Sequence, residues 1–258
     1  MLRFVSLGSG SRGNATLIQA GNTRLLLDDG FSLRELEQRL ARLELHPENI
    51  DAVLVTHEHG DHIKGVGPLA RKYQMPVWMT HGTWRNASCG DVPELRLFGS
   101  HTPAFIIGDI EVTPFAVPHD AREPTQFTFS YQELKLGILT DAGSFTPHVI
   151  AAIRDVDALL LECNHDPQML RDGPYPPRLQ ERVGGSYGHL SNDQAAQLLS
   201  RIDHARLQHL VVGHVSEKNN SPQLARQSLE AVCETLSTRI SLLRQEGGDG
   251  WFELQPAR

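Results

Sequence analysis

Four candidate metal ligands occur in HxHxDH spacing in the segment 56–62, THEHGDH. Three are imidazoles and one is a carboxylate, and these donors suit Zn²⁺, Mn²⁺ or Fe²⁺. The apolar run 52–55 precedes them, so a strand would deliver the ligands together at a sheet edge. A solvated polar loop is the alternative, but the HxHxDH spacing favours a two-metal hydrolase. The candidate ligands are His57, His59, Asp61 and His62.

Three further candidate ligands, His119, Asp141 and His214, each follow an apolar stretch that reads as a strand. Taken singly, each residue could equally have a structural role, because an Asp after a strand is often a turn former or a helix cap. Their order and position alongside the HxHxDH segment favour one shared metal site.

The elements that would position these residues read as strands in both halves of the chain, alternating with helices. A strand over 52–56 and a helix over 63–72 flank the HxHxDH segment, and helices are expected over 192–201 and 222–236. No repeat, low-complexity tract or linker divides the 258 residues. We therefore predict one α/β domain over residues 1–258, with stacked sheets and helices outside.

Composition limits the compartment and the partners. No apolar run approaches a membrane span, and the first residues do not resemble a signal peptide. The three scattered cysteines imply no disulfide framework, which favours the reducing cytoplasm. The net charge of −7 argues against indiscriminate binding to nucleic-acid backbone, although bound divalent ions would make one cleft locally cationic. The three cysteines mentioned above are Cys89, Cys163 and Cys233.

The order HxHxDH, His, Asp, His resembles the metal-binding pattern of the metallo-β-lactamase superfamily, and Asp28 matches its early Asp-x-Gly element. The resemblance implies a four-layer αββα sandwich with a binuclear metal site at the sheet edges. It assigns His57, His59 and His119 to one ion. It assigns Asp61, His62 and His214 to the second ion, Asp141 to a bridging position, and Asp28 to a supporting role behind the ligands.

The residues at two positions narrow the choice among the enzyme classes of this superfamily. Redox members typically carry Glu at the position of His59, which disfavours an oxygen or nitric-oxide reductase. The β-lactamase enzymes usually carry Cys at the position of Asp141, whereas an Asp bridge is more typical of phosphodiesterases and thioesterases.

The segment 188–196, GHLSNDQAA, resembles a segment of tRNase Z and related phosphodiesterases. His189 stands just before the predicted helix, whose N-cap would be Ser191 with Gln194 completing a capping box. A helix N-terminus attracts phosphate, and an imidazole there could protonate the leaving oxygen. A purely structural role for His189 is the alternative.

Four more segments, 9–14, 118–124, 162–176 and 214–220, resemble the YycJ/WalJ family. Members of that family are regarded as DNA-processing nucleases with exonuclease activity. The family is related to tRNase Z and to phosphodiesterases of the PhnP type. The interval between Asp141 and His189 is too short for the β-CASP domain of many nucleic-acid-processing relatives.

Candidate substrate contacts come from loops and helix starts. The Gly-rich loop 8–14 could present N–H groups to a phosphate, although it also reads as an ordinary hairpin. Basic side chains near the motifs could contact a nucleic-acid backbone, or could be solvated surface charge. His165 is expected to support the ligands or to bind an extra ion. The substrate-binding candidates are Ser11, Asn14, Ser191, Arg178 and Lys218.

The sequence thus predicts a metal-dependent phosphodiester hydrolase, a nuclease with exonuclease action on DNA. Two divalent ions (zinc, manganese or iron) would share a hydroxide and Asp141. Asp61 would position the hydroxide and His189 would act as general acid. Three alternatives stay open: a small-molecule or cyclic-nucleotide phosphodiesterase, a thioesterase or lactonase, and a regulatory binding protein with an idle site. Metal identity, DNA against RNA, polarity and oligomeric state also stay open.

Overall fold

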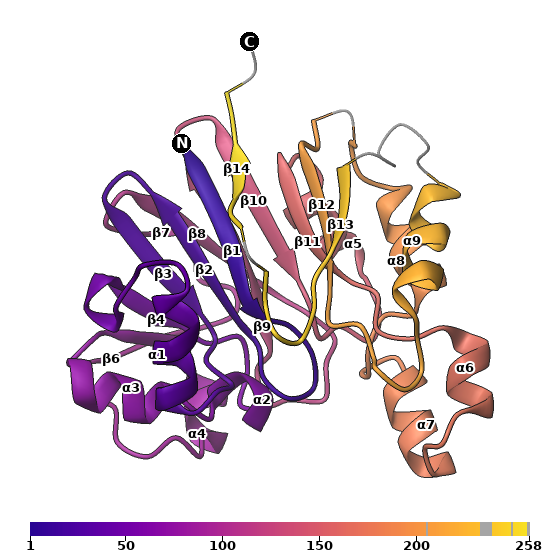
Figure 1. The fold of residues 1–258 in the computed structure, drawn as a ribbon, viewed down its shortest axis with the longest axis horizontal. Helices are drawn as coiled ribbons and strands as arrows, with labels where there is room; N and C mark the ends of the chain where they lie inside the picture. The colour runs from indigo at the N-terminus through magenta and orange to yellow at the C-terminus, as the bar shows by residue number, and fades with distance from the viewer. Residues whose placement is uncertain (205, 233–238, 249, 257–258) are drawn as a thin grey trace.

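Two β-sheets of seven strands each lie face to face at the centre of the molecule (Figure 1). The computed structural model describes residues 1–204, 206–232, 239–248 and 250–256. The first sheet runs β14 (Phe252–Leu254), β1 (Leu2–Gly8), β2 (Ala15–Ala20), β3 (Thr23–Leu27), β4 (Ala52–Leu54), β5 (Val77–Thr80) and β6 (Leu95–Phe98). The second runs β13 (Ile240–Leu242), β12 (His209–Gly213), β11 (Ala158–Glu162), β10 (Leu134–Leu139), β9 (Thr125–Tyr131), β8 (Ile110–Ala116) and β7 (Phe105–Ile107).

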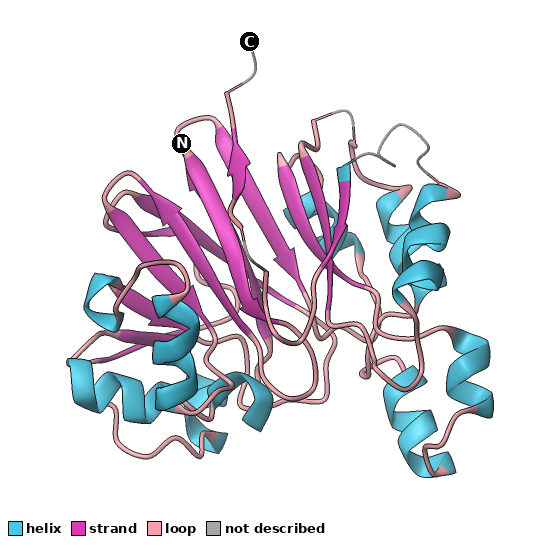
Figure 2. Ribbon diagram, viewed as in Figure 1, coloured by secondary structure: helices cyan, strands magenta, loops and turns pink. Residues whose placement is uncertain are grey.

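Helices cover the outer faces of both sheets (Figure 2). The N-terminal half contributes α1 (Leu33–Ala41), the 3-10 turn η1 (Pro47–Asn49), α2 (Gly60–Ile63), α3 (Val66–Tyr73) and α4 (His81–Asn86). The C-terminal half contributes α5 (Pro147–Ile153), α6 (Pro167–Asp172), α7 (Pro177–Gly184), α8 (Asn192–Leu199) and α9 (Pro222–Glu230). None of the helices in these described ranges combines the length and apolar character needed to cross a membrane.

Three apolar clusters fill the spaces between these layers. Successive strand residues point to opposite faces, so Leu160 packs between the sheets while Leu159 and Leu161 face the helices. In the first sheet, Phe4 likewise packs between the sheets and Val5 faces the helices. Both faces of the central strands are therefore buried, which explains their nearly continuous apolar sequences. The predicted four-layer αββα sandwich is confirmed.

Several predicted boundaries were wrong. The helix expected over 63–72 is two helices, α2 and α3, separated at Gly65. A Cβ at Gly65 would lie 2.2 Å from Asp29 Oδ2, so the chain passes close to this carboxylate at the break. The helix expected over 192–201 ends at Leu199, and that expected over 222–236 is described as far as Glu230, with 233–236 outside the described residues. Helices α4, α6 and α7 were not predicted.

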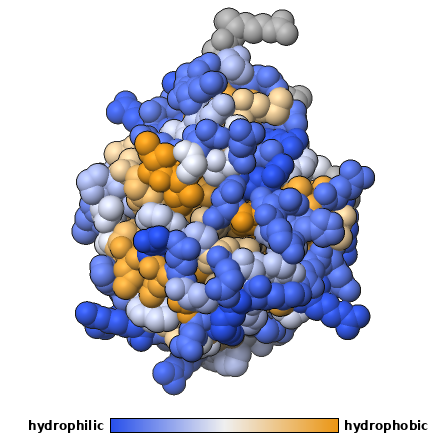
Figure 3. Space-filling model, turned by 90° about the vertical axis from the view of Figure 1, so that its left-hand side faces the viewer, coloured by the Kyte–Doolittle hydropathy of each residue, from blue (hydrophilic) through white to orange (hydrophobic). Residues whose placement is uncertain are grey.

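One side of the molecule carries the open edges of both sheets, formed by β6 and β7. Apolar patches show on this side in the space-filling view (Figure 3). Leu97 of β6 is 38% exposed and Ile106 of β7 is 71% exposed. The candidate ligands lie away from these two edge strands, because they follow inner strands of the sheets.

Candidate metal centre

The seven predicted ligands converge on one site at the ends of inner strands. The first sheet supplies four of them, in the loop after β4 and in α2, and the second sheet supplies three, just after β8, β10 and β12. Among the described residues, overlapping sets of ligand atoms lie within 4.8 Å of one another. Three of these sets contain only predicted ligands: His57, His59 and His119; Asp61, His62 and His214; and His57, His62 and Asp141.

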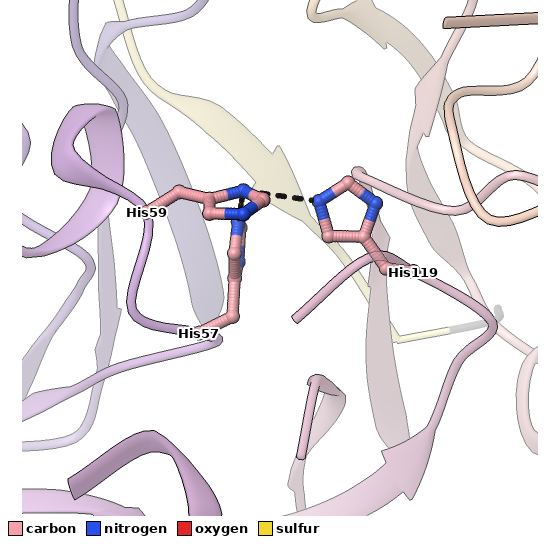
Figure 4. Close-up of side chains that lie close together, drawn as sticks. All are labelled: His57, His59 and His119. Atoms are coloured by element: carbon pink, nitrogen blue, oxygen red, sulfur yellow. Dashed lines mark hydrogen bonds between the residues drawn. The ribbon is translucent and has the colours of Figure 1, made fainter. Parts of the chain in front are cut away.

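The imidazoles of His57, His59 and His119 form the first group, and their rings turn toward one another (Figure 4). His57 Nε2 lies 3.0 Å from His59 Nδ1, which lies 3.3 Å from His119 Nε2. His119 Nδ1 is 3.0 Å from Gly188 O, a contact that orients its Nε2 toward the group. Burial lowers the pKa of His57 and of His119, which favours the neutral imidazole that a metal requires.

Asp141 lies at the centre of the second group. Its Oδ2 is 3.3 Å from His62 Nε2 and 3.1 Å from His214 Nδ1, and Asp61 Oδ2 is 3.6 Å from His62 Nε2. Asp141 also belongs to a set with His57, so it stands between the two groups. This is the location that a bridging ligand would need.

Electrostatics at this second group favour bound positive charge. Burial disfavours the charged forms of His62 and His214, but the nearby carboxylates, Asp141 foremost, outweigh it and hold both pKa values well above their usual range. Burial would raise the pKa of Asp141, but His214 and His62 hold it well below its usual range. Asp141 Oδ2 and His214 Nδ1 are both buried without a well-oriented hydrogen bond. A divalent cation fits this donor set.

Asp28 supports the second group from behind. Its Oδ2 lies 2.8 Å from His62 Nδ1 and accepts a hydrogen bond from Thr56 Oγ1, while its Oδ1 accepts one from the Thr56 N–H. This contact turns His62 Nε2 toward Asp141. Asn14, a predicted substrate contact, lies beside the ligands: its Nδ2 donates to Gly10 O and to Asp61 O and is 3.1 Å from His62 Nε2.

Backbone strain is concentrated at this site. Among the described residues other than glycine, six have a left-handed φ, and three of these are Asp28 (61°), Asp141 (52°) and His214 (52°). Asp28 and His214 stand directly after β3 and β12, and Asp141 stands two residues after the end of β10. Such a conformation is uncommon outside glycine and persists where surrounding structure enforces it.

Glu162 is a candidate functional residue that was not predicted. It ends β11, is fully buried, and its Oε1 lies 2.8 Å from His189 Nδ1 and 3.3 Å from His214 Nδ1. Burial would raise its pKa, but His189 outweighs this and lowers it to about 2. Burial would lower the pKa of His189, but Glu162 raises it. A carboxylate ending an apolar strand, as at Asp141, was the available signal.

A cavity of about 360 Å³ opens onto the ligands. His59, Asp61, Asp141, His189 and His214 line it on the side of the metal centre, and Ser11 reaches it from the Gly-rich loop. The side chain of His189 is 22% exposed there. The predicted catalytic pair, Asp61 and His189, therefore faces the same space as the metal ligands.

The remaining predicted site residues lie outside the lining of this cavity. Ser191 caps α8, because its Oγ accepts from Gln194 N and its own N–H donates to Gln194 Oε1; the predicted capping box is confirmed. His165 is buried behind this cap, and burial lowers its pKa to about 4. Arg178 and Lys218 are exposed. Lys218 Nζ lies 5.7 Å from the ring centroid of Tyr175, which does line the cavity.

Comparison with known sequences agrees with this arrangement. The family model "Beta-lactamase superfamily domain" matches residues 23–214. Exodeoxyribonuclease YycJ of Bacillus anthracis is 37% identical over 236 residues, which are 90% of this chain and 89% of that protein. Exodeoxyribonuclease WalJ of Streptococcus pneumoniae (strain D39) is 35% identical over 234 residues, 88% of this chain and 86% of that protein.

Solved structures show the same fold at low sequence identity. The metallo-β-lactamase-fold protein YhfI of Bacillus subtilis aligns with a TM-score of 0.74 at 17% identity, over 97% of this chain and 98% of that one. A diphosphatase of the PhnP family aligns with a TM-score of 0.68 at 17% identity, over 99% and 98% of the two chains. The short form of human tRNase Z aligns with a TM-score of 0.65 at 17% identity, over 99% and 100%.

Fold and sequence together define a hydrolase with the metallo-β-lactamase fold and with His and Asp clusters suited to divalent metals. The chain belongs to the metallo-β-lactamase superfamily and, within it, to the YycJ/WalJ family.

Proposed function

We propose that this protein is a metal-dependent exonuclease that hydrolyses phosphodiester bonds of DNA, with residues 1–258 acting as one domain. The observation that carries the proposal is the pairing of His189 with buried Glu162 beside the metal ligands, with His189 and four of the ligands lining one cavity. The names of the YycJ and WalJ relatives, exodeoxyribonucleases, support the choice of DNA. We also propose a cytoplasmic location, which the three scattered cysteines favour.

We assign the ligands to two divalent ions as the groups suggest. His57, His59 and His119 would hold one ion, Asp61, His62 and His214 the other, and Asp141 would contact both. Such a pair supplies an activated water and stabilises charge on the phosphate oxygens. The structure is compatible with zinc, manganese or iron, since nitrogen and oxygen donors suit all three.

The side chains around the cavity would handle orientation and protons. His189 Nδ1 faces Glu162, so Nε2 is the ring nitrogen available to a substrate in the cavity. Glu162 raises the pKa of His189, which favours the protonated ring that a general acid for the leaving oxygen needs. Asp61, whose side chain is 27% exposed, would orient the attacking water.

The direct test compares end-labelled single-stranded DNA, double-stranded DNA, RNA, a cyclic nucleotide and a thioester, with Mn²⁺ or Zn²⁺ added to metal-free protein. We expect release of nucleotides from a DNA end, loss of this activity with chelator, and its absence in an Asp141→Asn control prepared identically. Turnover confined to the cyclic nucleotide would instead support a small-molecule phosphodiesterase. Turnover confined to the thioester would support the thioesterase alternative.

A further inference from the structure

Helix α7 presents apolar side chains to the cavity rather than to a hydrophobic core. None of the residues of α7 is buried. Leu179 and Val183 stand one turn apart, so they share one face of the helix, and both line the cavity together with Tyr175. All three are half-buried. The apolar face of α7 is thus left for a ligand to cover.

The cavity therefore has two chemically different walls. Metal ligands and His189 form one wall, and Tyr175, Leu179 and Val183 form part of the other. Its volume, about 360 Å³, is at the small end of the range for sites that enclose a small molecule. It suits a single nucleotide unit, with an anionic group at one wall and a flat, weakly polar ring at the other.

Two cations stand at the margin of the apolar wall. Arg182 of α7 lines the cavity and pairs through Nε with Asp120 Oδ2. Lys218 Nζ lies 5.7 Å from the centroid of the Tyr175 ring. Cations at this margin suit the phosphates of a strand that leaves the cavity, because phosphate contacts position a nucleic acid without reading its sequence.

We propose that Tyr175, Leu179 and Val183 bind the base of the terminal nucleotide, with the base stacked on Tyr175 and its phosphate at the metal ligands. This inference rests on the proposed nuclease function and specifies its substrate as a strand end. Stacking on an aromatic ring is tolerant of base identity, so the wall accepts any of the four bases. A strand end enters the cavity, and the interior of a duplex does not.

The test uses the metal-loaded enzyme and two chromogenic diesters with the same leaving group. One is thymidine p-nitrophenyl phosphate, as the 5′ and the 3′ isomer, and the other is methyl p-nitrophenyl phosphate, which has no base. We expect Tyr175→Ala to lower kcat/KM for one thymidine isomer about tenfold and to leave the methyl ester unchanged. Tyr175→Phe retains the ring and should retain the preference.

Controls separate stacking from damage to the helix. Glu181 is exposed on α7, the helix that follows Tyr175, and lies outside the cavity lining, so Glu181→Ala should retain the preference. If Tyr175→Ala does not fold, Tyr175→Leu keeps apolar bulk without the ring and gives the same comparison. An unchanged thymidine preference, or an equal loss on both esters, would overturn the inference while the phosphodiesterase function stands. Failure of the wild type on both esters would instead reject the proposed function and this inference with it.

Discussion

At the scale of single residues, the pairing of His189 with Glu162 suits proton transfer. Glu162 Oε1 holds His189 Nδ1 at 2.8 Å, and metal binding is the competing role, because His189 also forms a set of possible ligands with Asp141, Glu162 and His214. We expect His189→Ala to retain its metals and to lose DNA hydrolysis by about 10²–10⁴-fold, as for loss of a general acid. Elemental analysis and kcat on DNA check both points.

The leaving group provides the control for this variant. A p-nitrophenolate leaves without needing a proton, so His189→Ala should lose far less activity on a p-nitrophenyl diester than on DNA. Equal losses on both substrates, or loss of metal from the variant, would contradict the general-acid assignment.

A second residue-scale prediction concerns buried Asp29. Burial raises its pKa to about 8, against the hydrogen bond from Phe31 N–H, and the nearby charges of Asp28 and Glu35 add to the rise. Because the folded protein retains this proton from about pH 4 to pH 8 and the unfolded chain does not, Asp29 makes the fold less stable as pH rises through that range. Relative to wild type, Asp29→Asn should therefore gain melting temperature between pH 5 and 8 and level off above it. A difference independent of pH would refute this.

The sequence predicted those site residues that follow an apolar strand. His57, His119, Asp141 and His214 follow apolar strands, so their positions could be read from hydropathy before any contact was known. Glu162 also ends an apolar strand, but the contact that reveals its role is with His189, 27 positions away in the chain. Contacts between distant segments are not visible in local patterns.

At the scale of elements, the ligands are positioned where two segments of backbone approach each other closely. A Cβ at Gly30 would lie 1.8 Å from Asp61 O, and Asn14 N–H donates to that same oxygen. We expect Gly30→Ala to displace Asp61, to destabilise the fold by about 1–3 kcal/mol and to reduce metal content. Denaturant unfolding and elemental analysis measure the two effects.

The matched control is Gly60, the glycine that directly precedes Asp61 in the HxHxDH segment. A Cβ at Gly60 would have no heavy atom within 4 Å, so Gly60→Ala should keep both stability and metal content. If the two variants have the same stability and the same metal content, the close approach of Gly30 to Asp61 O does not position Asp61. The break at Gly65 escaped prediction for a related reason, because it depends on a contact with Asp29, far away in the chain.

At the scale of the whole molecule, the metal centre links the two halves of the sandwich. His57, His59, Asp61 and His62 come from the first sheet, and the other three ligands come from the second. Ions held between them would bind the folded state and not the unfolded chain, so saturating metal should raise the melting temperature. Calorimetry of metal-free and reloaded protein checks this, and an unchanged melting temperature would contradict a centre shared by the sheets.

The central claim is that the seven-ligand centre drives hydrolysis of DNA from its ends. The most direct measurement titrates Mn²⁺ or Zn²⁺ into metal-free wild type and Asp141→Asn, and follows release of nucleotides from end-labelled DNA together with bound metal. We predict that nucleotide release rises with metal occupancy in the wild type and is absent in Asp141→Asn. Nucleotide release that is independent of metal, or equal in the two proteins, would contradict the account.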